Sequence, residues 1–128
     1  YTNAKGRAYG CLSFDLSGVG TIVSAKLTLH RKSGVGLNRK ANVTVYGTTA
    51  GRGSNPANGL TGAYASGTEL ISWDAYATLD VTAAAQALKA GSIAQLVLYT
   101  GETGVYSGKV YSYHYAQFDS ATLEVVYT

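Results

Sequence analysis

Short segments in which apolar and polar residues alternate dominate the chain. In residues 8–16, Leu12 and Phe14 fall on one face of an extended chain, while Ser13 and Asp15 fall on the other. Gly or Ser clusters bound such segments, and β-branched and aromatic residues are frequent within them, as is typical of strands. The segments with this pattern are residues 8–16, 22–31, 42–48, 94–100, 110–116 and 121–127. Many short strands separated by turn signals predict an all-β fold, an antiparallel sandwich or barrel.

One segment, residues 82–90, departs from this alternation and reads TAAAQALKA. Alanine is the strongest helix former, and Asp80 or Thr82 can cap the first turn. Lys89 complements the helix dipole in the last turn, and Gly91 can terminate the helix. The sequence therefore predicts one short helix over 82–90, which covers one end of the sandwich.

Residues 50–68 follow neither pattern. They read AGRGSNPANGLTGAYASGT, and this wealth of Gly, Ser and Asn predicts a long loop. The chain shows no domain boundary and no internal repeat. Residues 1–128 are therefore predicted to form a single β-sandwich domain.

The composition narrows the cellular setting. Only 13% of the 128 residues are charged, whereas 11 residues are Tyr. Cys11 is the only cysteine, so no internal disulfide can form, and no apolar run approaches the roughly 20 residues of a membrane span. A composition with few charges and many tyrosines resembles that of secreted, cell-surface and phage-tail proteins. We therefore expect an extracellular, cell-surface or virion protein without membrane insertion. Because Tyr1 is not a start methionine and no signal peptide opens the chain, we expect a piece of a longer modular protein.

Basic residues cluster around residues 33–38, which read SGVGLN and are predicted as a hairpin loop. The tip of this hairpin would carry Arg31 and Lys32 on one arm and Arg39 and Lys40 on the other. Such a tip can clamp the anionic groups of acidic sugars or phosphates. A solvated tip kept soluble by its charge fits the same pattern. No nucleic-acid reader motif accompanies the cluster, so we expect no nucleic-acid partner.

Tyr111, Tyr113 and Tyr115 alternate with Ser112 and His114. A period of two places these rings on one side of a strand. They can form a platform on which the C–H faces of sugars stack, with the phenol hydroxyls bonding sugar oxygens. Packing at the edge of the core is the other interpretation of this pattern.

Catalytic and metal-binding motifs are scarce. No G-x-S-x-G, S-x-x-K or H-E-x-x-H occurs, and ionisable groups are few, so we expect no enzyme. His30 and His114 each lack a second metal ligand at close spacing, and we expect no metal site and no cofactor. Oxygen ligands for a structural calcium ion would have to come from the carboxylates of Asp15, Asp80, Glu102 and Asp119, but no D-x-D-x-D-G loop is present.

Three ordered segments resemble DNRLRE-type domains. They are GCLSFDLSGVGTIVSAKLTLH at 10–30, TLDVTAAAQALKAG at 78–91 and ATLEVVY at 121–127. The resemblance implies a β-sandwich of jelly-roll type and an accessory role in modular extracellular and phage-tail proteins, some of which carry related carbohydrate-binding modules. The tryptophan-rich middle of that family is sparse here, and Trp73 and Tyr76 stand near its place. Trp73 therefore joins the predicted ligand-binding residues.

These observations lead to a non-catalytic carbohydrate-binding module as the expected function, with an acidic or cell-surface polysaccharide as partner. The alternative is a structural, oligomerising or receptor-binding tip domain of a phage tail or bacterial surface protein. In that case the tyrosine-rich face would be a subunit interface in a homo-oligomer of the parent protein.

Overall fold

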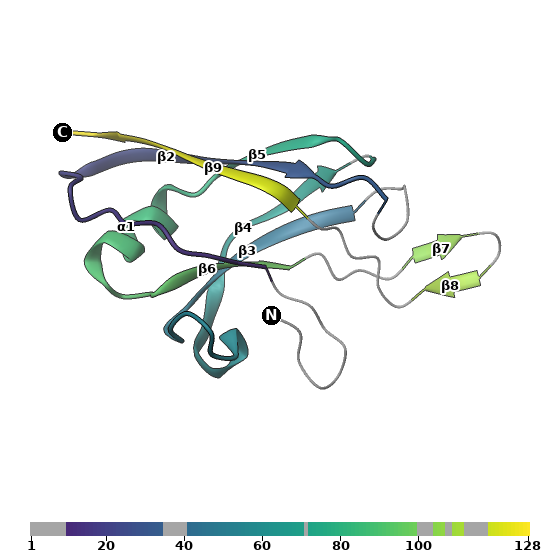
Figure 1. Cartoon of the computed structure of the whole chain (residues 1–128), viewed down its shortest axis with the longest axis horizontal. Helices are drawn as coiled ribbons and strands as arrows, with labels where there is room; N and C mark the ends of the chain where they lie inside the picture. The colour runs from purple at the N-terminus through teal and green to yellow at the C-terminus, as the bar shows by residue number, and fades with distance from the viewer. Residues whose placement is uncertain (1–9, 35–40, 71, 100–103, 107–108, 112–117) are drawn as a thin grey trace.

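The computed structural model describes residues 10–34, 41–70, 72–99, 104–106, 109–111 and 118–128 (Figure 1). Within these residues, two antiparallel sheets of different size lie face to face, and a small hairpin extends from one end. This arrangement confirms the predicted all-β class and is sandwich-like.

The larger sheet has the strand order β1-β6-β3-β4. Its strands are β1 (Gly10–Leu12), β6 (Gln95–Tyr99), β3 (Ala41–Thr48) and β4 (Leu60–Leu70). The smaller sheet has the order β5-β2-β9, and its strands are β5 (Tyr76–Asp80), β2 (Ile22–Arg31) and β9 (Phe118–Tyr127). The hairpin consists of β7 (Gly104–Tyr106) and β8 (Lys109–Tyr111).

The core lies between the two sheets, where both sheets contribute buried apolar side chains. On β2 the side chains of Ala25, Leu27 and Leu29 are buried, whereas Lys26 between them is exposed. Buried residues from both sheets form one cluster, which includes Leu27, Leu29, Leu79, Val43, Val45, Leu96 and Leu98. Burial of apolar area from water is the main driving force for bringing the two sheets together.

The predicted helix is confirmed with its bounds: α1 spans Thr82–Ala90 and lies at the end of the molecule opposite the β7–β8 hairpin (Figure 1). Ala84 and Ala85 are fully buried in the core cluster. Gly91 ends the helix in the left-handed conformation, with a φ of 78°, and its N–H donates to the carbonyls of Ala87 and Leu88.

Replacing Gly91 with alanine is expected to lower the free energy of unfolding by about 1 kcal/mol, because a Cβ is unfavourable at positive φ. Urea denaturation followed by circular dichroism measures this loss. Gly18→Ala is the matched control, since Gly18 has no positive φ and nothing within 4 Å of the added Cβ. Equal losses in the two variants would contradict a role for backbone conformation at Gly91.

The prediction of a loop over residues 50–68 is wrong for its second half. A 3-10 helix, η1, spans Pro56–Gly59, and β4 begins at Leu60. The pairing of β4 with β3 shifts register between Val43 and Thr48, which is the mark of bulges. A bulge breaks the period of two, so this strand shows no regular alternation in the sequence.

The predicted hairpin around 33–38 is also wrong, because β2 and β3 belong to different sheets. Residues 35–40, between these strands, lie outside the described part of the chain. The predicted strand over 8–16 is shorter, since β1 ends at Leu12, although Phe14 and Leu16 still pack on the core. Of the predicted strand 110–116, β8 covers the first two residues, and residues 112–117 lie outside the described part of the chain.

Candidate functional site

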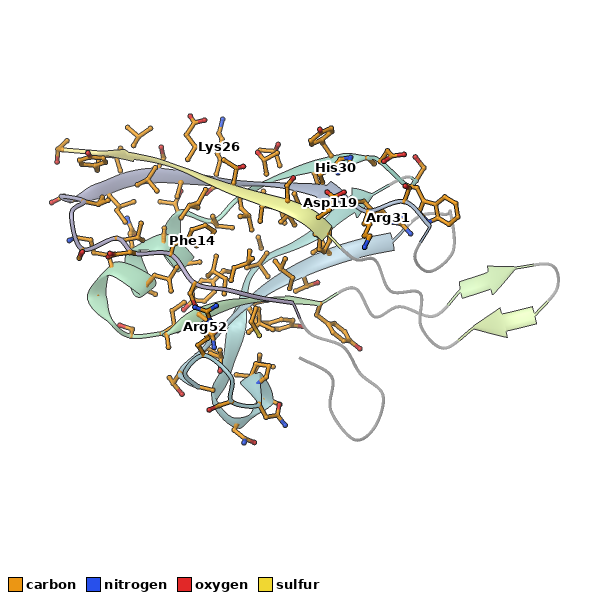
Figure 2. All side chains as sticks on the ribbon, in the orientation of Figure 1. Phe14, Lys26, His30, Arg31, Arg52 and Asp119 are labelled. Atoms are coloured by element: carbon orange, nitrogen blue, oxygen red, sulfur yellow. The ribbon has the colours of Figure 1, made fainter. Side chains whose placement is uncertain are left out.

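The outward-facing surface of β5, β2 and β9 gathers polar side chains in regular rows, and we call this surface the outer face. Each row takes one residue from each strand, because the register aligns the strands residue by residue. The rows are Tyr76, His30 and Ser120; Thr78, Thr28 and Thr122; and Asp80, Lys26 and Glu124. Directly opposed residues on one face of a sheet lie close enough to interact. Figure 2 shows Lys26 and His30 on the side of the sheet that faces away from the core.

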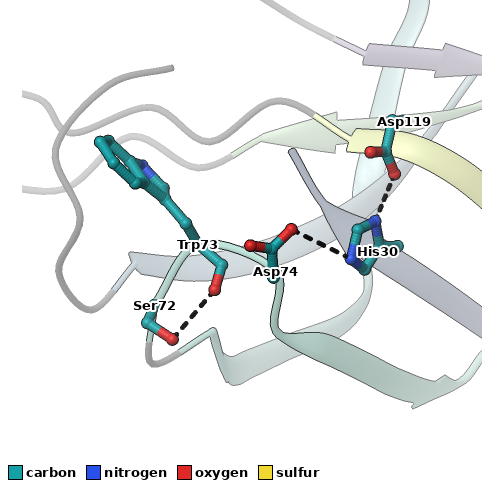
Figure 3. A network of polar contacts seen from close by, with 5 residues as sticks. All are labelled: His30, Ser72, Trp73, Asp74 and Asp119. Atoms are coloured by element: carbon teal, nitrogen blue, oxygen red, sulfur yellow. Dashed lines mark hydrogen bonds and ion pairs between the residues drawn. The ribbon is translucent and has the colours of Figure 1, made fainter. Parts of the chain in front are cut away.

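The row with Tyr76 continues into a cluster of ionisable groups around His30 (Figure 3). The Nδ1 atom of His30 lies 2.5 Å from Oδ1 of Asp119, and its Nε2 atom lies 3.7 Å from Oδ1 of Asp74. A register shift between β2 and β9 after His30 places Asp119 beside the imidazole. Asp74 reaches it from the turn before β5, where it has a φ of 63°. Aspartate tolerates this left-handed conformation better than most residues do.

Tyr76 completes the cluster with an aromatic ring that is exposed to solvent. The residue is 70% exposed, and its ring centroid lies 4.6 Å from that of His30 at an interplanar angle of 43°. The imidazole therefore supports one side of the tyrosine ring. We call His30, Asp74, Tyr76 and Asp119 the His30 cluster: an imidazole in contact with an exposed aromatic ring and with two carboxylates.

The row formed by Asp80, Lys26 and Glu124 joins the outer face to α1. Oδ1 of Asp80 accepts hydrogen bonds from the Thr82 hydroxyl at 2.6 Å and from the Thr82 amide at 3.0 Å. The hydroxyl bond lowers the pKa of Asp80, and the amide and the Lys26 ammonium lower it further. The Thr82 hydroxyl also accepts from the Ala25 amide at 3.1 Å, so this contact holds the helix against β2.

The Asp80→Asn variant is expected to be less stable than the native protein near neutral pH. Because the pKa of Asp80 is lower in the folded than in the unfolded protein, its contribution is present above its ordinary pKa of about 3.9 and is lost as the pH falls through the folded value. The stability difference should thus shrink as the pH falls below about 4 in urea unfolding experiments. Glu124→Gln removes the other carboxylate beside Lys26 and is the control. A difference that stays constant with pH would contradict the assignment.

Of the four residues predicted for the basic clamp, the structure describes Arg31 and Lys32. Arg31 is fully buried at the end of β2, and Figure 2 shows its side chain on the core side of the sheet. It therefore cannot belong to an exposed clamp, because it points to the face that also holds Leu29. Lys32 is exposed, and Arg39 and Lys40 lie outside the described residues.

The structure does not describe the side chains that were predicted to form the tyrosine platform. Tyr113 and Tyr115 lie outside the described residues, and for Tyr111 only the backbone, in β8, is described. Trp73 precedes Asp74 in the turn before β5 and is half-buried, and its carbonyl accepts from the Ser72 hydroxyl at 3.1 Å. Its indole is directed away from His30 (Figure 3).

Sequence reasoning missed the His30 cluster. Its one available signal was the alternation in YATLD at 76–80, which places Tyr76, Thr78 and Asp80 on the same face of a strand. In the described part of the chain, no group of three His, Cys, Asp or Glu side chains is arranged to hold a metal ion. The same residues include no helix with the length and apolar character needed to cross a membrane.

Comparisons with known proteins return no match to a family model, to a curated protein or to a solved structure. The function is therefore argued from the outer face itself: a sheet surface with rows of polar side chains and the exposed Tyr76 at one end.

Proposed function

We propose that this domain is a non-catalytic carbohydrate-binding module and that it binds sugars on the outer face, with the His30 cluster at the centre of the site. The single observation that carries the proposal is the exposed Tyr76, at 70%, whose ring packs on His30 while the carboxylates of Asp74 and Asp119 contact the same imidazole. An aromatic ring offers a large apolar surface with little conformational entropy to lose, which suits stacking against the C–H face of a pyranose.

The carboxylates determine which sugars suit this cluster. An ionised carboxylate only accepts hydrogen bonds, so it matches the hydroxyl groups of a sugar. It also repels a second anion at short range. At this site the proposal therefore favours neutral sugars of a cell-surface polysaccharide over the acidic sugars that the basic cluster suggested.

The finer fold assignment and the cellular setting belong to the same proposal. We propose a jelly-roll sandwich related to DNRLRE-type domains, located outside the cell or on a virion. The proposed fold is supported by the nested pairing of β2 with β9 and of β3 with β6. The ordered sequence resemblance supports both the fold and the location.

Affinity electrophoresis of the purified chain in gels containing a glucan, a mannan, a xylan or alginate tests the proposal. We expect at least one neutral polysaccharide to retard the chain, and competition by its soluble oligosaccharides to abolish the retardation. Retardation by none of the neutral polymers would overturn the proposal. Retardation by alginate alone would move the site away from the carboxylates of the His30 cluster.

A second candidate function is self-association, and a specific observation favours it. At the end of the smaller sheet that lies away from the His30 cluster, three apolar side chains are exposed: Val23 at 56%, and Val126 and Tyr127 at 52% each. An apolar patch on a sheet can bind a second copy of the same chain. Light scattering after size exclusion should then give a mass above 13.3 kDa that Val126→Asp reduces. A monomer at all concentrations would rule this candidate out.

A further inference from the structure

A recess of about 480 Å³ lies at the β1 edge of the larger sheet, in the sheet that does not carry the outer face. One wall is the chain from Gly10 to Ser13, the other is the turn from Arg52 to Ser54, and Gln95 lies between them. Its volume is within the range of small-molecule sites, roughly 300–1,000 Å³.

Hydrogen bonds of two buried side chains, Gln95 and Thr48, hold both walls in place. Gln95, at 3% exposure, donates from Nε2 to the carbonyl of Ala50 at 3.1 Å, and its Oε1 accepts from the Ser13 hydroxyl at 3.4 Å. Thr48, which is fully buried, donates to the carbonyl of Pro56 at 2.8 Å and accepts from the Ala50 amide at 3.1 Å. The turn that carries Arg52 is thus tied to the sheet on both of its sides.

The lining of the recess carries a positive charge and no negative one. Arg52 is the charged residue of its lining, and no hydrogen bond or ion pair engages the guanidinium within the part of the chain that the structure describes. Figure 2 shows this side chain below the segment that carries β1. Partial burial raises the pKa of the Cys11 thiol, another lining group, which therefore adds no negative charge at neutral pH.

We propose that this recess is a second binding site, which takes a small ligand bearing one oxyanion group and neighbouring hydroxyls. The Arg52 guanidinium binds the oxyanion in bidentate geometry, as its planar fork favours. The hydroxyls of Ser13 and Ser54 contact the polar remainder of the ligand: Ser13, which donates to Gln95, accepts a hydrogen bond from the ligand, and Ser54 can donate or accept. A neutral sugar at the His30 cluster and an oxyanion ligand at Arg52 then occupy different sheets, so the two sites do not overlap.

Titration of the ¹⁵N-labelled chain by NMR tests this site with inorganic phosphate, glucose 6-phosphate, glucuronate and glucose as probes. We expect amide shifts at Ser13, Gly53 and Ser54 with the three anionic probes, and none at these positions with glucose. Tighter binding of glucose 6-phosphate than of phosphate assigns part of the affinity to the hydroxyls. Preference for glucuronate identifies a carboxylate ligand, and preference for glucose 6-phosphate identifies a phosphate ester.

The Arg52→Gln variant is expected to bind the preferred anion about tenfold more weakly or worse, the change that a loss of about 1.4 kcal/mol produces. Arg52→Lys keeps the charge but loses the bidentate geometry and should fall between the two. Lys89→Gln, on α1, removes the same charge elsewhere and is the control. If Arg52→Gln and Lys89→Gln weaken binding equally, or if the anions shift other amides only, the site does not exist. Unchanged melting temperatures establish that the variants are folded.

Discussion

Replacing Leu27 with alanine is expected to lower the free energy of unfolding by about 3 kcal/mol or more, the usual cost of truncating a fully buried leucine. Leu27 has no exposed surface and lies at the middle of β2, opposite Leu79 on β5 and Leu123 on β9. Because β2 is the central strand of the smaller sheet, neighbouring elements on both sides limit how far a cavity can collapse. Urea denaturation followed by circular dichroism gives the difference.

Leu60→Ala is the matched control, because it removes the same atoms from a residue that is 40% exposed at the start of β4. We expect it to cost less than about 1 kcal/mol. Domains of this size are stable by only about 5–15 kcal/mol, and Cys11 is a free thiol, so Leu27→Ala could unfold the chain outright. Leu27→Met, which conserves volume, should then cost less than about 1.5 kcal/mol. Similar losses for Leu27→Ala and Leu60→Ala would contradict the position of the core.

Elements with a strong local signal could be predicted from the sequence. The period of two over residues 22–31 and the alanine-rich run over 82–90 give the bounds of β2 and α1 as the structure has them. Each signal depends only on neighbours in the chain, so it can be recognised without knowledge of the tertiary structure. β4 and its bulges depend on the partner strand β3 and leave no comparable trace in the sequence.

The position of Arg31 illustrates how two signals can compete. The alternation of β2 places Arg31 on the same face as Leu27 and Leu29, which is the core face. Its charge suggested a solvent-exposed position instead, because charged residues are rarely buried without partners. The structure follows the alternation, since the pleat of a strand fixes the direction of every second side chain.

The His30 cluster could not be predicted for a different reason. His30 and Asp119 contact each other although 89 positions separate them in the chain. Only the register of β9 on β2, together with the irregularity after His30, brings them together. A sequence pattern predicts the face on which a residue lies, but not which residue of a distant strand lies opposite.

Replacing Tyr76 with alanine is expected to weaken binding of the neutral polysaccharide by about 30-fold, because an anchoring aromatic side chain typically contributes about 2 kcal/mol. The stability of the variant should stay within about 0.5 kcal/mol of the native protein, since the ring is mostly in water and its removal leaves no cavity. Isothermal titration calorimetry with an oligosaccharide of the bound polymer measures the first quantity, and urea unfolding the second.

Tyr127→Ala is the matched control for this experiment. Tyr127 is 52% exposed and belongs to the same sheet, but it pairs with Ile22 at the end of β2 that lies away from His30. If sugar stacks on Tyr76, the Tyr127 variant keeps the native affinity, and Tyr76→Phe, which retains the ring, keeps most of it. Native affinity in Tyr76→Ala would show that the sugar does not stack on this ring. A loss in Tyr127→Ala alone would move the binding surface to the other end of the smaller sheet, where β9 ends beside the start of β2.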